Sequence, residues 1–197
     1  KNILTRATGA DYFVYNPDYL GLKALAEETK AQTVPFVTTL PFSEDVIPLL
    51  GKHNVDNVRA AATAARIMGV SDAQIEKAVR AFKPLPHRLE KVGTYKDITF
   101  YDDAISTTPE STIAALEALP NVGTLFLGGK DRGYDFTALA QTIFEKNILN
   151  IVLFPESGAR ILEALEDSAK KNGTMLPKIF PTSDMKEAVT FAYANTP

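Results

Sequence analysis

Cysteine is absent from the 197 residues of the sequence, and histidine occurs only twice. Without cysteine the chain can form neither a disulfide framework nor a zinc site built on thiolates. A lack of cysteine also fits a cytoplasmic protein, and we expect that location. The two histidines, His53 and His87, lie far apart in sequence and lack metal-ligand spacing, so no metal site is predicted on this chain.

The sequence also lacks an excess of one charge and a long apolar run. There are 24 acidic and 21 basic side chains, for a formal net charge of −3. Since nucleic-acid-binding surfaces usually carry a basic excess, no nucleic-acid partner is expected. No apolar run approaches the roughly 20 residues of a membrane-spanning helix, and no signal-peptide pattern opens the chain.

The two ends of the sequence indicate a piece of a longer protein. The first residue is Lys1 rather than methionine, and the last, Pro197, directly follows a predicted helix. A doubly wound domain would normally continue there with at least one more strand. We therefore expect the chain to be a fragment.

What is present is ordinary globular composition, with 45% hydrophobic and 23% charged residues. The first part of the chain predicts a strand at residues 11–16, a helix at residues 19–30 and a second strand at residues 34–40. Within that second strand, Pro35 has no backbone N–H to donate. It therefore predicts a sheet edge or the start of the strand.

Two helices are predicted next. The alanine-rich residues 55–68 favour a helix, with Asn54 as its N-cap and Gly69 as its stop. Ser71, followed three residues later by glutamine, has the capping-box spacing and predicts a further helix that ends at residue 82.

Prolines 84 and 86 interrupt the helical pattern and indicate a domain boundary, which divides the chain into residues 1–86 and 87–197. Beyond the boundary, strands alternate with helices. This order predicts an α/β domain with a Rossmann-like, mostly parallel sheet, whose ligands bind beyond the carboxyl ends of the strands. The predicted strands are residues 98–101, 124–127, 151–154 and 178–180, and the predicted helices are residues 111–119, 136–144, 159–171 and 185–194.

Two polar segments flank the boundary. In GKHNVDN, Asn54 and Asn57 are three residues apart at a helix start, so both amides can face one side and suit the edge of a purine base. A helix cap plus a surface asparagine is the plainer alternative. In LPHRLE, the forked guanidinium of Arg88 suits phosphate oxygens, although a surface arginine in a proline-rich linker would look the same.

The most informative segment is YDDAISTTPES, which follows a predicted strand. A carboxylate at a strand end, Asp102 or Asp103, can accept from ribose hydroxyls. Hydroxyls and free N–H groups at the following helix start favour an anion. A simple capped helix, with Ser106 or Thr108 as cap and Pro109 in the first turn, explains the proline and one hydroxyl but does not require the aspartates.

A glycine-rich loop, LGGKDRGYDF, follows the next predicted strand. Its glycines allow close approach of a ligand, and Lys130 and Arg132 supply positive charge. The loop is neither a Walker A loop nor a GxGxxG fingerprint, and a plain strand-to-helix turn is an equal alternative.

In this order, GKHNVDN, LPHRLE, DDAISTTPEST and GGKDRGYDF resemble the Mur ligase family over nearly the whole chain, most of all its glutamate-adding branch. The resemblance implies an ATP-dependent ligase that adds glutamate to UDP-N-acetylmuramoyl-L-alanine through an acyl phosphate, in peptidoglycan precursor synthesis for cell shape and division. Residues 1–86 would be the tail of the central ATP-binding domain, and residues 87–197 an incomplete Rossmann-like C-terminal domain.

The resemblance further implies a cytoplasmic monomer whose partners are the two small-molecule substrates and ATP. The phosphate-binding loop and the Mg²⁺ ligands of the family would lie upstream of Lys1, so the fragment alone is expected to be inactive. By matching position, the adenine-side residues are Asn54 and Asn57, the ribose residue is Asp103, and the catalytic arginine at the ATP phosphates is Arg88. The positions for the incoming glutamate are Thr107, Lys130 and Arg132.

The chain departs from the family pattern Asn-Asp-Ser-Lys-Ala-Thr-Asn that is usual for D-glutamate addition. Asp102, Ala104, Ile105 and Thr108 replace its Asn, Ser, Lys and final Asn. The Ser-Thr-Thr-Pro loop resembles a branch that adds L-glutamate, so D-glutamate, L-glutamate or another amino acid remains open. Folylpolyglutamate and cyanophycin synthetases are related alternatives, though LPHR favours the Mur branch. A non-catalytic nucleotide-binding α/β module is the alternative outside the enzymes.

Overall fold

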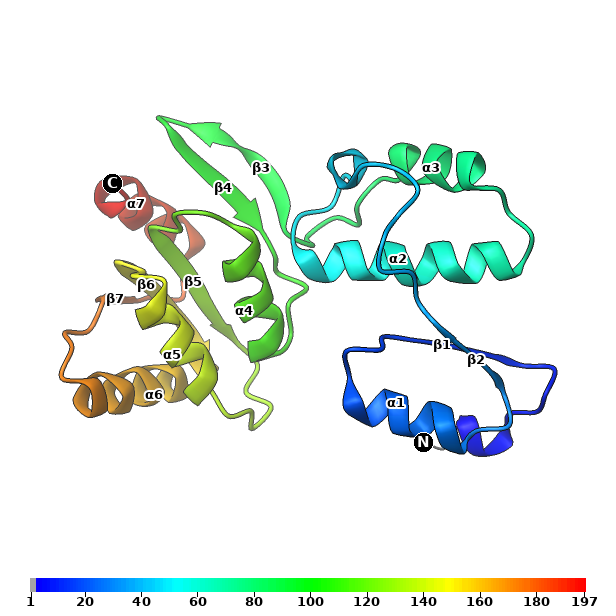
Figure 1. Ribbon diagram of the computed structural model, residues 1–197. Coiled ribbons are helices and arrows are strands. Elements are labelled where there is room, and N and C mark those ends of the chain that lie inside the picture. Colours follow the sequence, from blue (N-terminus) through cyan, green and yellow to red (C-terminus); the bar gives the residue numbers. More distant parts are fainter. Residues whose placement is uncertain (1–2) are drawn as a thin grey trace. The chain divides into compact units, whose positions relative to one another are not determined.

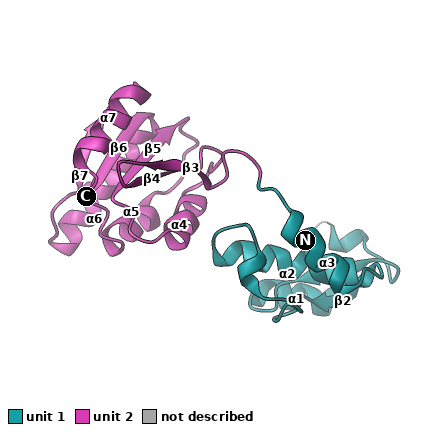
Figure 2. Ribbon diagram, turned by 90° about the horizontal axis from the view of Figure 1, so that it is seen from above, with its two compact units in different colours: residues 1–84 teal, residues 85–197 magenta. Residues whose placement is uncertain are grey.

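The computed structural model describes residues 3–197 and forms two compact units, residues 1–84 and 85–197. Figure 2 colours the two units separately. The predicted first domain opens with Lys1 and Asn2, which lie outside the described residues. Between residues 3 and 197, no helix is long and apolar enough to cross a membrane.

The first unit contains a small parallel sheet and a pair of longer helices (Figure 1). Strands β1 and β2 pair in parallel, with Tyr12 opposite Gln32, and helix α1 connects them. The buried core includes Ala62 from α2, Ile75 from α3 and Leu40 from the segment that follows β2. In chain order the elements are η1 (Leu4–Arg6), β1 (Tyr12–Tyr15), α1 (Leu20–Glu28), β2 (Gln32–Pro35), η2 (Glu44–Val46), α2 (Lys52–Ile67) and α3 (Asp72–Ala81).

Two sequence predictions in this unit were wrong in detail. The second strand ends at Pro35 instead of running to residue 40. After Pro35, the N–H of Phe36 still donates to the Tyr15 carbonyl of β1. The N–H of Val37 instead donates to the side-chain hydroxyl of Thr63 at 3.0 Å, so the pairing with β1 ends there. Asn54 is not an N-cap, because Gly51, at a φ of 94°, lets the chain enter α2 three residues earlier. The capping box at Ser71 is confirmed.

The second unit has the predicted α/β architecture. Strands β5, β6 and β7 form a parallel sheet in that order, and an antiparallel hairpin of β3 and β4 precedes it. The sequence did not predict β3. In chain order the elements are β3 (Glu90–Tyr95), β4 (Ile98–Asp102), α4 (Pro109–Ala118), β5 (Thr124–Gly129), α5 (Thr137–Glu145), β6 (Asn150–Glu156), α6 (Ser157–Asn172), β7 (Lys178–Pro181) and α7 (Met185–Asn195).

The central strand β6 lies at the middle of the core. Helices α5 and α6 pack together on one side of the sheet, and α7 lies on the other (Figure 1). The side chains of Ile143, Ile151 and Leu165 are fully buried between these layers. At the start of β6, the buried amide of Asn150 donates to the Asn195 carbonyl at 2.9 Å, which ties the end of α7 to the sheet. The loops that follow β5 and β6 therefore begin on strands that are packed into a buried core.

Candidate functional site

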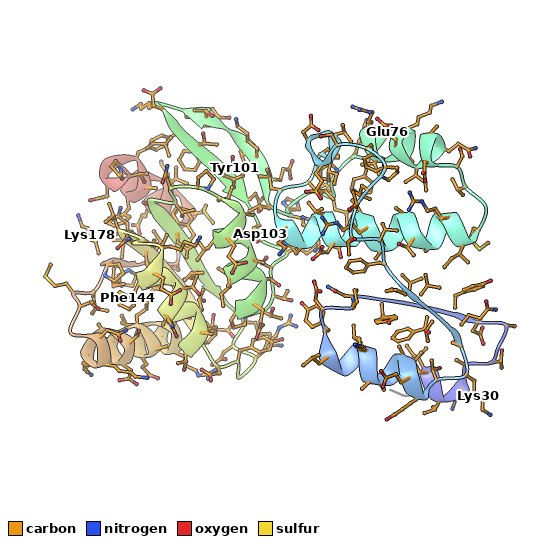
Figure 3. All side chains as sticks on the ribbon, viewed as in Figure 1. Lys30, Glu76, Tyr101, Asp103, Phe144 and Lys178 are labelled. Carbon is orange, nitrogen blue, oxygen red and sulfur yellow. The ribbon has the colours of Figure 1, made fainter. Side chains whose placement is uncertain are left out.

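The loop after β4 is organised around Asp103, which Figure 3 labels. Its Oδ1 accepts a hydrogen bond from the N–H of Leu89 at 2.8 Å, and its Oδ2 accepts from the hydroxyl of Ser106. Ser106 is thereby used within the loop, and Thr108 is the N-cap of α4, with Pro109 at the first helical position. Since each carboxylate oxygen can accept more than one hydrogen bond, Asp103 keeps acceptor capacity for a ligand.

The neighbouring Asp102 pairs with His87. The Nδ1 of His87 lies 2.7 Å from Oδ2 of Asp102, whose Oδ1 accepts from the N–H of Ala104 at 3.0 Å. The hydrogen bond and charge of Asp102, with a smaller contribution from Glu90, raise the pKa of His87 above its ordinary value. The same bond from His87, together with that from Ala104, lowers the pKa of Asp102.

These contacts hold the turn that carries Arg88. Its two neighbours, His87 at a φ of 61° and Leu89 at 47°, have left-handed backbone conformations, which are unfavourable for residues other than glycine. The N–H of Leu89 is bound to Asp103, and the carbonyl of His87 accepts from the N–H of Ile105 at 3.2 Å. Arg88 itself is exposed and, within residues 3–197, its guanidinium has no hydrogen-bond or ion-pair partner. The turn is therefore fixed while its cation is free.

The glycine-rich loop follows β5. At Gly128 the φ is +148°, and an added Cβ would lie 2.5 Å from the Cβ of Phe154. Gly128 therefore serves the close packing of β5 on β6 rather than the approach of a ligand. At Gly129 the φ is +102° and the space around it is open, so this glycine leaves room beside the backbone.

Arg160, on α6, fastens the glycine-rich loop. Its guanidinium donates to Oδ1 of Asp131 and to the carbonyl of Tyr134, both at 2.7 Å, and lies over the ring of Phe136. The N–H of Gly133 and then the guanidinium of Arg160 lower the pKa of Asp131. The carboxylate of Asp131 is thus satisfied internally, and that of Asp135, the other acidic residue of the loop, accepts from the N–H and the hydroxyl of Thr137.

The cations of the same loop remain outside this network. Lys130 and Arg132 are exposed, and neither forms an ion pair in the part of the chain that the structure describes. Thr107, in the loop after β4, is also exposed. A loop whose two carboxylates are engaged within the chain and whose two cations are free favours an anionic ligand.

In the first unit, the two asparagines contact each other at the start of α2. The amide of Asn54 is buried and donates to the Leu50 carbonyl at 2.7 Å, and its Oδ1 accepts from the amide of Asn57 at 3.3 Å. Asn57 is exposed. Asn54 therefore acts as a buried support, and Asn57 is the member of the pair with atoms available to a ligand.

The structure thus joins some predicted residues directly. Arg88 and Asp103 belong to one hydrogen-bonded assembly, whereas Lys130 and Arg132 extend from a different strand end, and the two asparagines lie in the other unit. Sequence reasoning missed Arg160, which is 29 residues from Asp131 and has no local signal. It also missed the pairing of His87, although the adjacent aspartates were visible. Among the described residues, no group of three or more acidic or histidine side chains could hold a metal ion.

Comparison with known proteins bears on the same segments. Residues 87–196 match the family described as Mur ligase, glutamate ligase domain. The UDP-N-acetylmuramoylalanine–D-glutamate ligase of Oenococcus oeni is 32% identical over 209 residues, which cover 97% of this chain and 46% of that relative. The corresponding ligase of Bacillus thuringiensis is 32% identical over 214 residues, 99% of this chain and 46% of the relative. The chain therefore spans slightly less than half the length of these curated relatives.

Solved structures share the fold at lower identity. MurF from Acinetobacter baumannii aligns with a TM-score of 0.70 at 19% identity, over 98% of this chain and 47% of that one. The folylpolyglutamate synthase of Mycobacterium tuberculosis, complexed with ADP, aligns with a TM-score of 0.67 at 15% identity, over 93% and 47%. The family match covers more than half of the chain, including the Arg88 turn, the Asp103 loop and the glycine-rich loop. The chain belongs to the Mur ligase family.

Proposed function

We propose that the chain is part of an ATP-dependent ligase that joins glutamate to UDP-N-acetylmuramoyl-L-alanine in peptidoglycan precursor synthesis. The observation that carries the proposal is Arg88, a free cation on a turn bound to the loop of Asp103. Residues 1–86 would be the tail of a central ATP-binding domain, and residues 87–197 the C-terminal domain. The whole enzyme would be a cytoplasmic monomer.

The donor and acceptor set fits a nucleotide. Arg88 supplies a bidentate cation for phosphate oxygens, Asp103 supplies acceptors for ribose hydroxyls, and Asn57 supplies both kinds of group for adenine. Asn54 would hold Asn57 in place through the hydrogen bond between their amides. When bound, ATP supplies the phosphoryl group that activates the muramoyl-alanine carboxylate. Mg²⁺ would accompany it in the whole enzyme, held by residues outside this chain.

The incoming amino acid would bind at the glycine-rich loop and the loop after β4. Glutamate brings two carboxylates, and Lys130 and Arg132 are two cations without internal partners. Thr107 would add a hydroxyl. These residues hold the amine so that it attacks the activated carbonyl carbon, whereupon an amide bond forms, phosphate leaves and the amine gives up its proton. Orienting the two reactants in this way can supply much of the rate acceleration.

The test is phosphate release by the complete protein with ATP and UDP-N-acetylmuramoyl-L-alanine. D-glutamate, L-glutamate and a panel of other amino acids are offered in parallel, with the 197-residue chain alone as an inactive control. Turnover with one glutamate isomer supports the proposal and identifies the isomer that the altered loop, with Ile105 and Thr108, accepts. Release with none of the amino acids, from a folded protein, contradicts it.

The same assay separates the alternatives. Turnover only with folate-type acceptors and glutamate would identify a folylpolyglutamate-type ligase, a possibility kept open by the shared fold. Nucleotide binding without phosphate release would identify a non-catalytic module. The two free cations on the glycine-rich loop favour a ligase for a dicarboxylic amino acid over the non-catalytic module. Both kinds of ligase would use glutamate, so the acceptor that supports turnover decides between them.

Arg160 offers a prediction about the amino-acid site. Replacing Arg160 by Met removes both 2.7 Å hydrogen bonds to the glycine-rich loop but keeps much of the apolar stem. We expect the KM for the amino acid to rise about tenfold, because the loop that carries Lys130 and Arg132 loses two of its anchors, while the KM for ATP stays within twofold. Steady-state kinetics of the complete protein measure both constants.

The matched control is Arg80→Met on α3, where the arginine pairs with Glu76 on the helix surface and with no other acidic side chain among residues 3–197. It should leave both constants unchanged. An Arg160→Met enzyme with unchanged KM for every substrate would show that the loop does not depend on this guanidinium.

A further inference from the structure

Besides the pairing of β3 with β4, three hydrogen bonds connect the turn at residues 87–90 to the loop at residues 102–106. Leu89 N–H donates to Asp103, and Ile105 N–H donates to the His87 carbonyl. The third joins the side chains of His87 and Asp102 at 2.7 Å. Within the loop, Ala104 N–H donates to the other oxygen of the Asp102 carboxylate.

The position of Asp102 makes its contact with His87 decisive. Asp102 is the final residue of β4, so its backbone is fixed by pairing with Glu90 on β3. Its two carboxylate oxygens are divided, one to the loop through Ala104 and one to the turn through His87. His87 has a left-handed backbone, which costs free energy and needs support from surrounding contacts. Arg88 directly follows His87 in the chain, so the conformation of His87 sets the direction in which Arg88 leaves the turn.

We propose that Asp102 is a positioning residue for Arg88, acting through His87. In this role Asp102 need not contact the nucleotide itself. It holds the ring of His87, which holds the turn against the β4 loop and so aims Arg88 toward the ligand of Asp103. The positioning of Arg88 is inferred from the contacts within the chain. Its effect on the binding and reaction of ATP rests on the proposed function.

The arrangement makes the position of Arg88 depend on pH. Two charged groups act on the His87 ring: Asp102 from β4, which binds its Nδ1, and Glu90 from β3, whose carboxylate accepts from the backbone N–H of His87 at 2.8 Å. The pKa of His87 is raised above 6.5. The stabilisation of the turn by the charged His87 ring is therefore complete below pH 6.5 and is lost as the pH rises through the raised pKa. The pKa of Asp102 is lowered below 3.8, so its contribution is complete above pH 3.8 and is lost on further acidification. The connection is therefore strongest between pH 3.8 and 6.5 and loosens at alkaline pH.

The first test uses the 197-residue chain and needs no ligand. NMR follows the His87 ring from pH 5 to pH 9, and hydrogen exchange follows the amides of Leu89 and Ile105. In Asp102→Asn the midpoint of the His87 titration should fall, and the two amides should exchange about tenfold faster at pH 6.5, the effect of losing one charge-assisted hydrogen bond.

The matched control is Asp97→Asn, which removes the same charge from the turn of the same hairpin, at an exposed position with a φ of 66° that asparagine tolerates. It should leave the midpoint and both amides as in the unchanged chain. If Asp102→Asn behaves like this control in either readout, the proposal is overturned, because Asp102 must act on the turn and must do so through His87.

A second measurement connects the positioning to activity. In the complete protein at pH 6.5, Asp102→Asn should lower kcat about tenfold with little change in the KM for the amino acid, and the fall in kcat at alkaline pH should shift toward lower pH. An unchanged kcat with the NMR effects present would overturn the proposed use of the turn. Absence of ligase activity in the unchanged protein would instead contradict the proposed function and leave the NMR result standing.

Discussion

Replacing Arg88 by Ala in the complete protein should lower kcat by about 10²- to 10³-fold. Losing one group that stabilises charge in a transition state typically has this effect. We expect a large effect because hydrogen bonds hold the turn around Arg88 in a strained, left-handed backbone conformation. The guanidinium itself has no partner within residues 3–197. A side chain so placed contributes nothing to internal pairing, so its removal should leave the fold intact. Phosphate release at saturating substrates measures kcat, and circular dichroism checks the fold.

Two further variants sharpen this test. Arg88→Lys keeps the charge but loses the forked geometry, and we expect it to recover only part of the activity. Arg80→Ala removes an exposed arginine from α3, where Glu76 is its partner (labelled in Figure 3), and should have no effect. An Arg88→Ala enzyme as active as Arg80→Ala would remove Arg88 from the mechanism.

Replacing Gly128 by Ala should cost about 2–4 kcal/mol of the free energy of unfolding of the second unit. The new Cβ would lie 2.5 Å from the Cβ of Phe154 and 2.7 Å from its carbonyl oxygen, and neither atom belongs to the flexible end of a side chain. The φ of +148° adds backbone strain for any residue with a Cβ. Because β5 is paired directly with the central strand β6, the clash cannot be relieved without separating the two strands. Chemical denaturation of the 197-residue chain measures the loss.

The adjacent glycine provides the control. Gly129 has a φ of +102°, but a Cβ there would meet no atom within 4 Å. Gly129→Ala should therefore show the backbone strain alone, about 1 kcal/mol. Equal losses for the two variants would mean that β5 and β6 do not approach each other as closely at Gly128 as the structure indicates.

Local patterns in the sequence were sufficient to predict most elements of the second unit. The parallel strands β5, β6 and β7 and the helices between them agree with the predicted alternation to within a few residues, because buried strands and amphipathic helices have different apolar periods. Strand β3 was missed for a physical reason. Its residues, EKVGTY, are largely exposed and carry no alternation, so the strand exists only because β4 pairs with it.

By itself, the sequence determined the family and the α/β class of this protein, because four short motifs occur in the right order and each is read from neighbouring residues. It also located the candidate ligand residues at strand ends and helix starts. Only the tertiary structure decided which of these residues hold another residue in place and which have side-chain atoms available to a ligand. Asn54 is buried behind Asn57, and Arg160 reaches Asp131 across 29 residues. His87 meets Asp102 across 15. Such contacts depend on strand register and helix packing, which bring distant residues together without leaving any local pattern in the chain.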